Sequence, residues 1–147
     1  MVLHTMPLGH SPLLEQYHLA LDEIMKGSAQ GYKKLYSRRD DVTLANPFGP
    51  PVRGWEEVAR ALERAASNYR DGEAIGFENV AKHVTAELAY IVEVERMQAK
   101  VGGREDLTPV ALRVTSIFRP EEGTWKVVHR HADPITTARP AESVIQE

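Results

Sequence analysis

From Phe77 to Ala132 apolar and polar residues alternate with a period of two, which is typical of β-strands with one buried face. Short segments that contain glycine interrupt the alternation and predict turns between the strands. The predicted strands are Phe77–Val84, Leu88–Ala99, Val110–Arg119 and Thr124–Ala132. The second half of the chain is therefore expected to form a sheet.

The first half shows the other period, with apolar residues three and four positions apart. Ser11 can cap a helix that has Pro12 in its first position and ends before Gly27. Three elements and a loop are expected to follow: a short helix over Ser28–Arg38, a strand over Val42–Ala45, a loop over Pro47–Pro51 and a helix from Gly54 to about Tyr69. This order predicts an α+β fold.

Polar side chains recur on one predicted face of the last two strands. Paired positions in a hairpin keep a constant sum, so a turn at Glu121–Gly123 sets Thr115 opposite His129. The same register sets Arg113 opposite His131. Two polar pairs are therefore predicted side by side on one face.

The strand before this hairpin extends the polar face. With a turn in the glycine-rich loop between the strands, Glu95 is predicted opposite Arg113 and Glu93 opposite Thr115. The predicted result is a row across three strands, Glu95–Arg113–His131.

This face suits a pocket, because its far end is apolar and a dry floor with a charged mouth is typical of ligand sites. Arg113 can hold a carboxylate or enolate oxygen, and His131 or Asp133 can move a proton near neutral pH. The predicted catalytic residues are His131, Asp133 and Glu95. The predicted ligand-binding residues on this face are Arg113, Glu93, Thr115, His129 and Trp125.

Other interpretations of the same row stay open. A Glu95–Arg113 pair can be a structural brace, and a polar sheet face can simply be solvated. His129 and His131 could share a metal ion with Glu93 or Asp133, but no further ligand signature supports this. No metal and no cofactor are expected.

The opposite face of the predicted sheet is apolar enough to need a cover. We expect a homodimer through this face. Its predicted members are Val92, Val94, Leu112, Val114 and Val128.

Composition narrows the class of protein. The 147 residues, of which 42% are hydrophobic, suit a single domain over residues 1–147. The net charge is −3 and the 18 Lys and Arg are scattered, so no nucleic-acid partner is expected. The chain has no cysteine, which excludes disulfides and thiolate chemistry. Without a leader-like segment or a membrane-length apolar run, a soluble cytoplasmic protein with no membrane contact is expected.

The order helix, helix, strand, helix and four strands resembles the nuclear transport factor 2-like superfamily, especially its SnoaL-like branch and the association domain of calcium/calmodulin-dependent kinase. The residues that carry the resemblance are Leu112–Thr115, Phe118–Arg119, Gly123, Trp125 and His129–Asp133. The resemblance implies a cone, with three N-terminal helices packed on a curved mixed sheet around a pocket. In the kinase domain, the arginine that matches Arg113 lines that pocket.

A second segment, with Leu35–Tyr36, Asp40–Val42, Asn46–Gly49 and Arg53–Gly54, resembles ketosteroid isomerase. In that enzyme an aspartate directly before the proline is the general base, but here the position is Asn46, whose amide cannot accept a proton at neutral pH. Asn46 either faces the pocket or ties down its own loop. The tyrosine that binds the oxyanion in that enzyme has no match in register on the first predicted helix, and the nearest candidate is Tyr17, about one turn away. We therefore do not expect a steroid isomerase that works by the aspartate mechanism.

Two classes of function remain open. The first is a small-molecule enzyme of the SnoaL-like kind, which would act by proton transfer as an isomerase, cyclase or dehydratase/hydratase on an apolar carbonyl or carboxylate compound. The second is a non-catalytic module for small-ligand binding or assembly. The superfamily contains both classes, so the fold alone does not decide between them.

Overall fold

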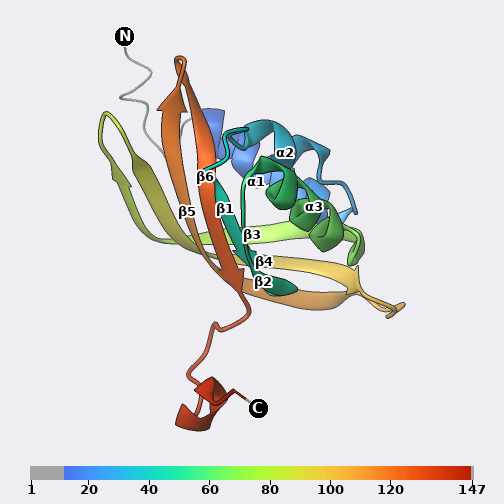
Figure 1. Ribbon diagram of the computed structural model, residues 1–147. Helices are drawn as coiled ribbons and strands as arrows, with labels where there is room; N and C mark the ends of the chain where they lie inside the picture. Colours follow the sequence, from blue (N-terminus) through green and yellow to red (C-terminus); the bar gives the residue numbers. More distant parts are fainter. Residues whose placement is uncertain (1–11, 147) are drawn as a thin grey trace.

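The structure is a computed structural model that describes residues 12–146 (Figure 1). The predicted cap Ser11 lies outside the described residues. The elements are α1 Pro12–Met25, α2 Gln30–Leu35, β1 Thr43–Asn46, β2 Gly49–Arg53, α3 Trp55–Ala66, β3 Tyr69–Val84, β4 Ala89–Val101, β5 Thr108–Glu121 and β6 Thr124–Asp133. A short 3₁₀ helix, Ala141–Val144, lies at the end of a C-terminal extension that points away from the sheet (Figure 1).

The six strands form one curved, mixed sheet in the order β2-β1-β6-β5-β4-β3. β1 runs parallel to β6, and every other neighbouring pair is antiparallel. The helices cover one face, with α1 against β3 and β4 and α3 against β1 and β2 (Figure 1). The predicted α+β class is confirmed. The expected helices are present as α1, α2 and α3, but only α1 and α2 precede the first strand, and α3 follows the β1–β2 hairpin.

Two element boundaries differ from the prediction for local reasons. The predicted loop Pro47–Pro51 contains most of β2, an edge strand, where proline is tolerated because no neighbour needs its missing N–H. β3 begins at Tyr69, ahead of the predicted Phe77. Its first half contains register shifts and the positive φ of Asp71, which break the alternation that would reveal a strand.

The core fills the space between the helices and the inner face of the sheet. α1 contributes Tyr17 and Leu21, α2 contributes Tyr32, and α3 contributes Val58 and Leu62, all buried. The tyrosine and phenylalanine rings meet at tilted or edge-on angles: Tyr17 lies 5.5 Å from both Tyr32 and Phe118, measured between ring centroids. An aromatic layer therefore separates the helices from the centre of the sheet.

The predicted register between β4 and β5 is wrong by one residue. Glu95 pairs with Leu112 and Val94 pairs with Arg113. Because neighbouring side chains in a strand point to opposite faces, this slip moves Arg113 to the outer face and Leu112 to the inner one. Leu112 and Val114, which we expected on the dimer face, are buried in the core.

The predicted register between β5 and β6 is also wrong. Thr115 pairs with His131 and Arg113 with Asp133. The pairing shifts between Ile117 and Phe118, so that Val128 becomes the extra residue of a β-bulge. The bulge reverses the alternation along β6, so Val127 is buried before it and Arg130 after it.

The fold predicts different costs for two glycines of β3. A Cβ at Gly72 would lie 2.3 Å from the Gln98 carbonyl oxygen and 2.6 Å from the Ala99 Cβ, whereas one at Gly76 would meet nothing within 4 Å. We expect Gly72→Ala to lower the free energy of unfolding by about 1–3 kcal/mol or more, and Gly76→Ala to change it by about 0.5 kcal/mol or less. Urea unfolding of both variants measures this, and equal losses would contradict the close packing of β3 on β4.

Candidate functional site

A buried ion pair between β4 and β6 lies at the centre of the molecule. The Glu95 side chain is fully buried, and the Arg130 side chain is 8% exposed. Arg130 donates from Nη1 to Oε2 of Glu95 at 2.8 Å and from Nη2 to Oε1 at 2.9 Å. This two-pronged geometry is the strongest form of a carboxylate–guanidinium contact. Burial would lower the pKa of Arg130, but the attraction of Glu95, its hydrogen bonds and the neighbouring tyrosines together outweigh burial and raise this pKa, so the guanidinium stays charged.

Tyrosine hydroxyls complete the surroundings of Arg130. Its Nη1 also donates to the Tyr17 hydroxyl at 3.0 Å, and that hydroxyl shares a hydrogen bond with Ser116 of β5. The Tyr32 ring lies 5.6 Å from the guanidinium, and its buried hydroxyl makes no hydrogen bond of good geometry within the described residues. Burial raises the pKa of Tyr17 well above its usual value and that of Tyr32 to about 12, so both rings are neutral at physiological pH.

A second buried carboxyl, that of Glu93, lies two residues before Glu95 on the same face of β4. His18 of α1 contacts it through Nε2, at 3.0 Å from Oε1 and 3.2 Å from Oε2. The His18 ring stacks on Phe77 of β3 with centroids 3.6 Å apart and remains partly open to solvent. Burial raises the pKa of Glu93, the hydrogen bond from His18 opposes this, and the nearby Glu95 adds to it.

A small cavity of about 30 Å³ lies beside Arg130 under α1 and α3. Its lining is mostly apolar and includes Leu21, Met97 and Leu112, while Asn46, Tyr69 and Arg130 supply polar atoms. It adjoins an open groove of about 480 Å³ that shares Pro47, Phe48, Tyr69 and Leu112 with it. The Phe48 ring meets Tyr69 edge-on at 5.9 Å, so these two rings stand between cavity and groove.

The predicted row Glu95–Arg113–His131 does not exist. Arg113 is on the outer face, 55% exposed, and donates to Asp133 from Nε at 3.0 Å and from Nη2 at 2.8 Å. His131 lies beside them, with Nε2 3.2 Å from Asp133, and its register partner Thr115 is half-buried on the same outer face. The register slip and the bulge separate these residues from Glu95, because Glu95 faces inward.

The other predicted site residues are divided between the core, the cavity and the outer face. His129 contacts the Thr43 hydroxyl through Nδ1 at 2.7 Å, and burial lowers its pKa. Trp125 is buried in the core. Asn46 lines the cavity and also accepts a hydrogen bond from the Phe48 backbone N–H at 2.9 Å, so both open interpretations of this residue apply.

Sequence reasoning missed most of the interior polar groups. Arg130, His18 and Ser116 were not predicted, nor were Tyr69 and Phe48 at the cavity. The available signal was the pair Val127–Val128, because two adjacent apolar residues in an alternating strand are typical of a bulge. Beyond such a bulge, Arg130 takes the inward position that we assigned to its neighbours.

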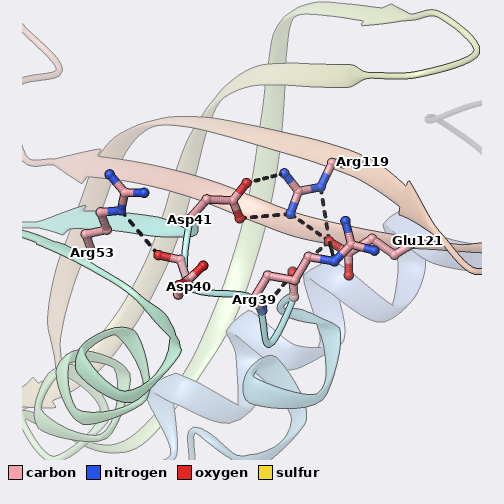
Figure 2. A network of polar contacts seen from close by, with 7 residues as sticks. Arg39, Asp40, Asp41, Arg53, Arg119 and Glu121 are labelled. Atoms are coloured by element: carbon pink, nitrogen blue, oxygen red, sulfur yellow. Dashed lines mark hydrogen bonds and ion pairs between the residues drawn. The ribbon is translucent and has the colours of Figure 1, made fainter.

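A separate polar network holds the segment between α2 and β1 against β5 (Figure 2). Arg119 donates to both carboxylate oxygens of Asp41, at 2.9 and 3.1 Å, and to Glu121. Glu121 Oε2 also accepts a hydrogen bond from the Ser37 hydroxyl at 2.7 Å, and it lies 3.6 Å from Nε of Arg39. The hydrogen bonds from Arg119 lower the pKa of Asp41. Because the Asp41 and Glu121 carboxylates are both paired with arginine, we assign this network a structural role.

Within residues 12–146, no group of three or more His, Cys, Asp or Glu side chains is placed to hold a metal ion. In the same part of the chain, no helix is both long and apolar enough to cross a membrane.

The pKa shifts of Glu93 and Asp133 predict opposite pH effects on stability. The folded state raises the pKa of Glu93, so its stabilising contribution is present below the unfolded pKa of about 4.3 and is lost as pH rises through the folded value. Burial would raise the pKa of Asp133, but the hydrogen bonds from Arg113 and the Ile135 backbone N–H and the charge of Arg113 together outweigh it, so the folded state lowers the pKa of Asp133. Its contribution is therefore lost as pH falls below about 4.

Native protein should lose stability relative to Glu93→Gln as pH rises from about 4 toward neutrality. It should lose stability relative to Asp133→Asn as pH falls through the acid range. Urea unfolding at a series of pH values measures both differences. Two pH-independent differences, or two of the same sign, would contradict the assigned environments.

The chain is similar to known proteins both in sequence and in fold. A family model described as the SnoaL-like domain matches residues 12–136. No match to this chain was found among curated proteins.

Solved structures with the same fold come from several bacteria. A nuclear transport factor 2-like superfamily protein from Salmonella enterica has a TM-score of 0.71 at 15% identity, over 88% of this chain and 91% of that chain. A ketosteroid isomerase-like protein from Erwinia carotovora has a TM-score of 0.68 at 17% identity, over 85% of this chain and 92% of that chain. A proposed dehydratase from Streptomyces avermitilis has a TM-score of 0.68 at 18% identity, over 85% of this chain and 93% of that chain. The solved structures share the fold, and because the family model spans most of its length, the chain belongs to the SnoaL-like domain family.

Proposed function

We propose that this protein binds a small, mostly apolar molecule at the cavity and the adjoining groove, with an oxygen atom of the molecule at Arg130. The observation that carries the proposal is the position of Arg130, a buried cation held by Glu95 and Tyr17 that also lines an otherwise mostly apolar cavity. Apolar walls with a few fixed polar groups are typical of small-molecule sites.

The two spaces would have different roles in binding. The groove, about 480 Å³, has room for the body of a ligand, whereas the cavity of about 30 Å³ takes only a small polar end. Phe48 is 39% exposed and lies between the two spaces, so it is the side chain whose movement would join them.

Proton-transfer chemistry of the isomerase, cyclase or dehydratase type is the second candidate. It is favoured by Glu93, a buried carboxyl with a raised pKa that contacts the partly exposed ring of His18. Such a pair can exchange a proton with solvent through the imidazole. The ketosteroid isomerase-like and dehydratase neighbours support the class of reaction, but Asn46 still argues against the aspartate mechanism.

Two alanines of α3 give a matched test of ligand binding. Both are half-buried, but only Ala65 lines the cavity. We expect Ala65→Leu to fill the cavity and weaken binding of a small ketone by about tenfold or more, and Ala59→Leu to change it by about twofold or less. Titration followed by methyl NMR of the cavity side chains measures both. Equal effects would contradict binding at this site.

We also propose a homodimer through the outer face of the sheet. With Leu112 and Val114 in the core, the apolar members left on this face are Val92, Val94 and Val128, each half-buried in the single chain. Ile117 of β5 joins them, because it is half-buried and points away from the buried Ser116 and Phe118.

Val92→Glu should produce a monomer, because the dimer would bury the new charge. Leu19→Glu is the matched control and should leave the dimer intact, because the 63% exposed Leu19 is on α1, on the other side of the sheet. Light scattering at micromolar concentration distinguishes the two states. A monomeric native protein would overturn the dimer.

A further inference from the structure

The cation at the cavity is already neutralised. Two of the three hydrogen bonds that the Arg130 side chain makes within the described residues go to Glu95, at 2.8 and 2.9 Å, and both side chains are buried. In a buried pair of this geometry the charges cancel at short range. A ligand at the cavity therefore meets the hydrogen-bond donors of a guanidinium without a free positive charge.

The groups around this pair add no positive charge to offset a bound anion. Tyr17 of α1, Tyr32 of α2 and Tyr69 of β3 face it, and burial raises the pKa of each phenol above its usual value, so all three are neutral. The remaining titratable groups are Tyr36, whose pKa burial also raises, and Glu93 and His18, which contact each other. Within the described residues, the hydrogen bonds and ion pairs of the Glu95 and Arg130 side chains involve no further basic side chain.

Arg130 still has donors for a ligand. A guanidinium has five N–H groups in a fixed plane. The hydrogen bonds to Glu95 and Tyr17 use both hydrogens of Nη1 and one of Nη2. The Nε–H and the second Nη2–H make no hydrogen bond of good geometry within residues 12–146, and the Tyr32 hydroxyl is the nearest protein group that could compete for them. A carbonyl or hydroxyl oxygen can accept these bonds without bringing a charge into the core.

We propose that the site selects neutral molecules with an acceptor oxygen over carboxylates of the same shape, and that Glu95 sets this selection. The inference rests on the proposed binding function and names its ligand class. A carboxylate would share Arg130 with Glu95 and leave one negative charge uncompensated among the mostly apolar walls of the cavity, which is unfavourable. A ketone would leave the charge balance unchanged.

Acetophenone and benzoate are suitable probes, because they have nearly the same shape and differ in charge. We expect the native protein to bind acetophenone about tenfold or more tightly than benzoate at neutral pH. Glu95→Gln should reverse this order, since Arg130 then holds an uncompensated charge that a carboxylate can neutralise. Glu95→Asp keeps the charge and should keep the native order. Methyl NMR titrations of the three proteins with the two probes give the six affinities.

Glu78→Gln is the matched control for removing a carboxylate from an arginine. Glu78 pairs with Arg96 at 3.1 Å on the exposed surface, away from the cavity lining. This variant should keep the native order of the two probes. A reversal in Glu78→Gln as large as that in Glu95→Gln would mean that total charge, and not the Glu95–Arg130 pair, sets the selection.

A measurement on the native protein covers the case in which Glu95→Gln does not fold. Calorimetric titration in buffers of different ionisation enthalpy should show that benzoate binds with uptake of about one proton, and acetophenone with none. Benzoate that binds as tightly as acetophenone without proton uptake would overturn the inference. If both probes bind and Ala65→Leu weakens both, the proposed function survives that result. If neither probe binds the native protein, the proposed function fails as well.

Discussion

The structure depends on burying Glu95 and Arg130 together. Removing two charges from water is unfavourable unless their geometry is good and their remaining hydrogen-bonding atoms find partners. β4 supplies the carboxylate, β6 the guanidinium, and α1 places Tyr17 where it accepts a further bond from Arg130. The position of α1 over the sheet is therefore fixed by polar contacts as well as by packing. The same requirement shapes the cavity, because Arg130 lies at its wall.

The class of fold could be predicted from the sequence, because it depends on features repeated along the chain. Alternation over four long strands and helical spacing before them are each supported by many residues, and a single exception does not change the result. β2 and the start of β3 were not predicted, because proline, glycine and the positive φ of Asp71 disturb the alternation of apolar and polar residues there. Those exceptions are at an edge strand and at a bulge, where local irregularity is tolerated.

The candidate site could be predicted only in part, because it depends on register. Glu93 and Glu95 were expected on the pocket face of β4, and they do face inward, opposite Val92 and Val94, since that strand alternates without interruption. Their partners were wrong. The register between β4 and β5 differs from the predicted one by one residue, so Leu112 and not Arg113 faces inward beside Glu95. On β6 the extra residue Val128 shifts the alternation, so Arg130 and not His131 faces inward. Register is set by loop lengths and bulges, which a periodic pattern does not report.

The separation of Glu95 and Arg130 in the chain has an evolutionary consequence. Each residue is on a different strand, and loss of either one alone leaves a buried charge without its counterpart, which is more unfavourable than loss of both. Selection should therefore remove single substitutions at these positions. Replacement of both residues by neutral side chains leaves no unpaired charge and can be tolerated. Among descendants of one ancestral sequence, the two positions should therefore change together or remain as they are.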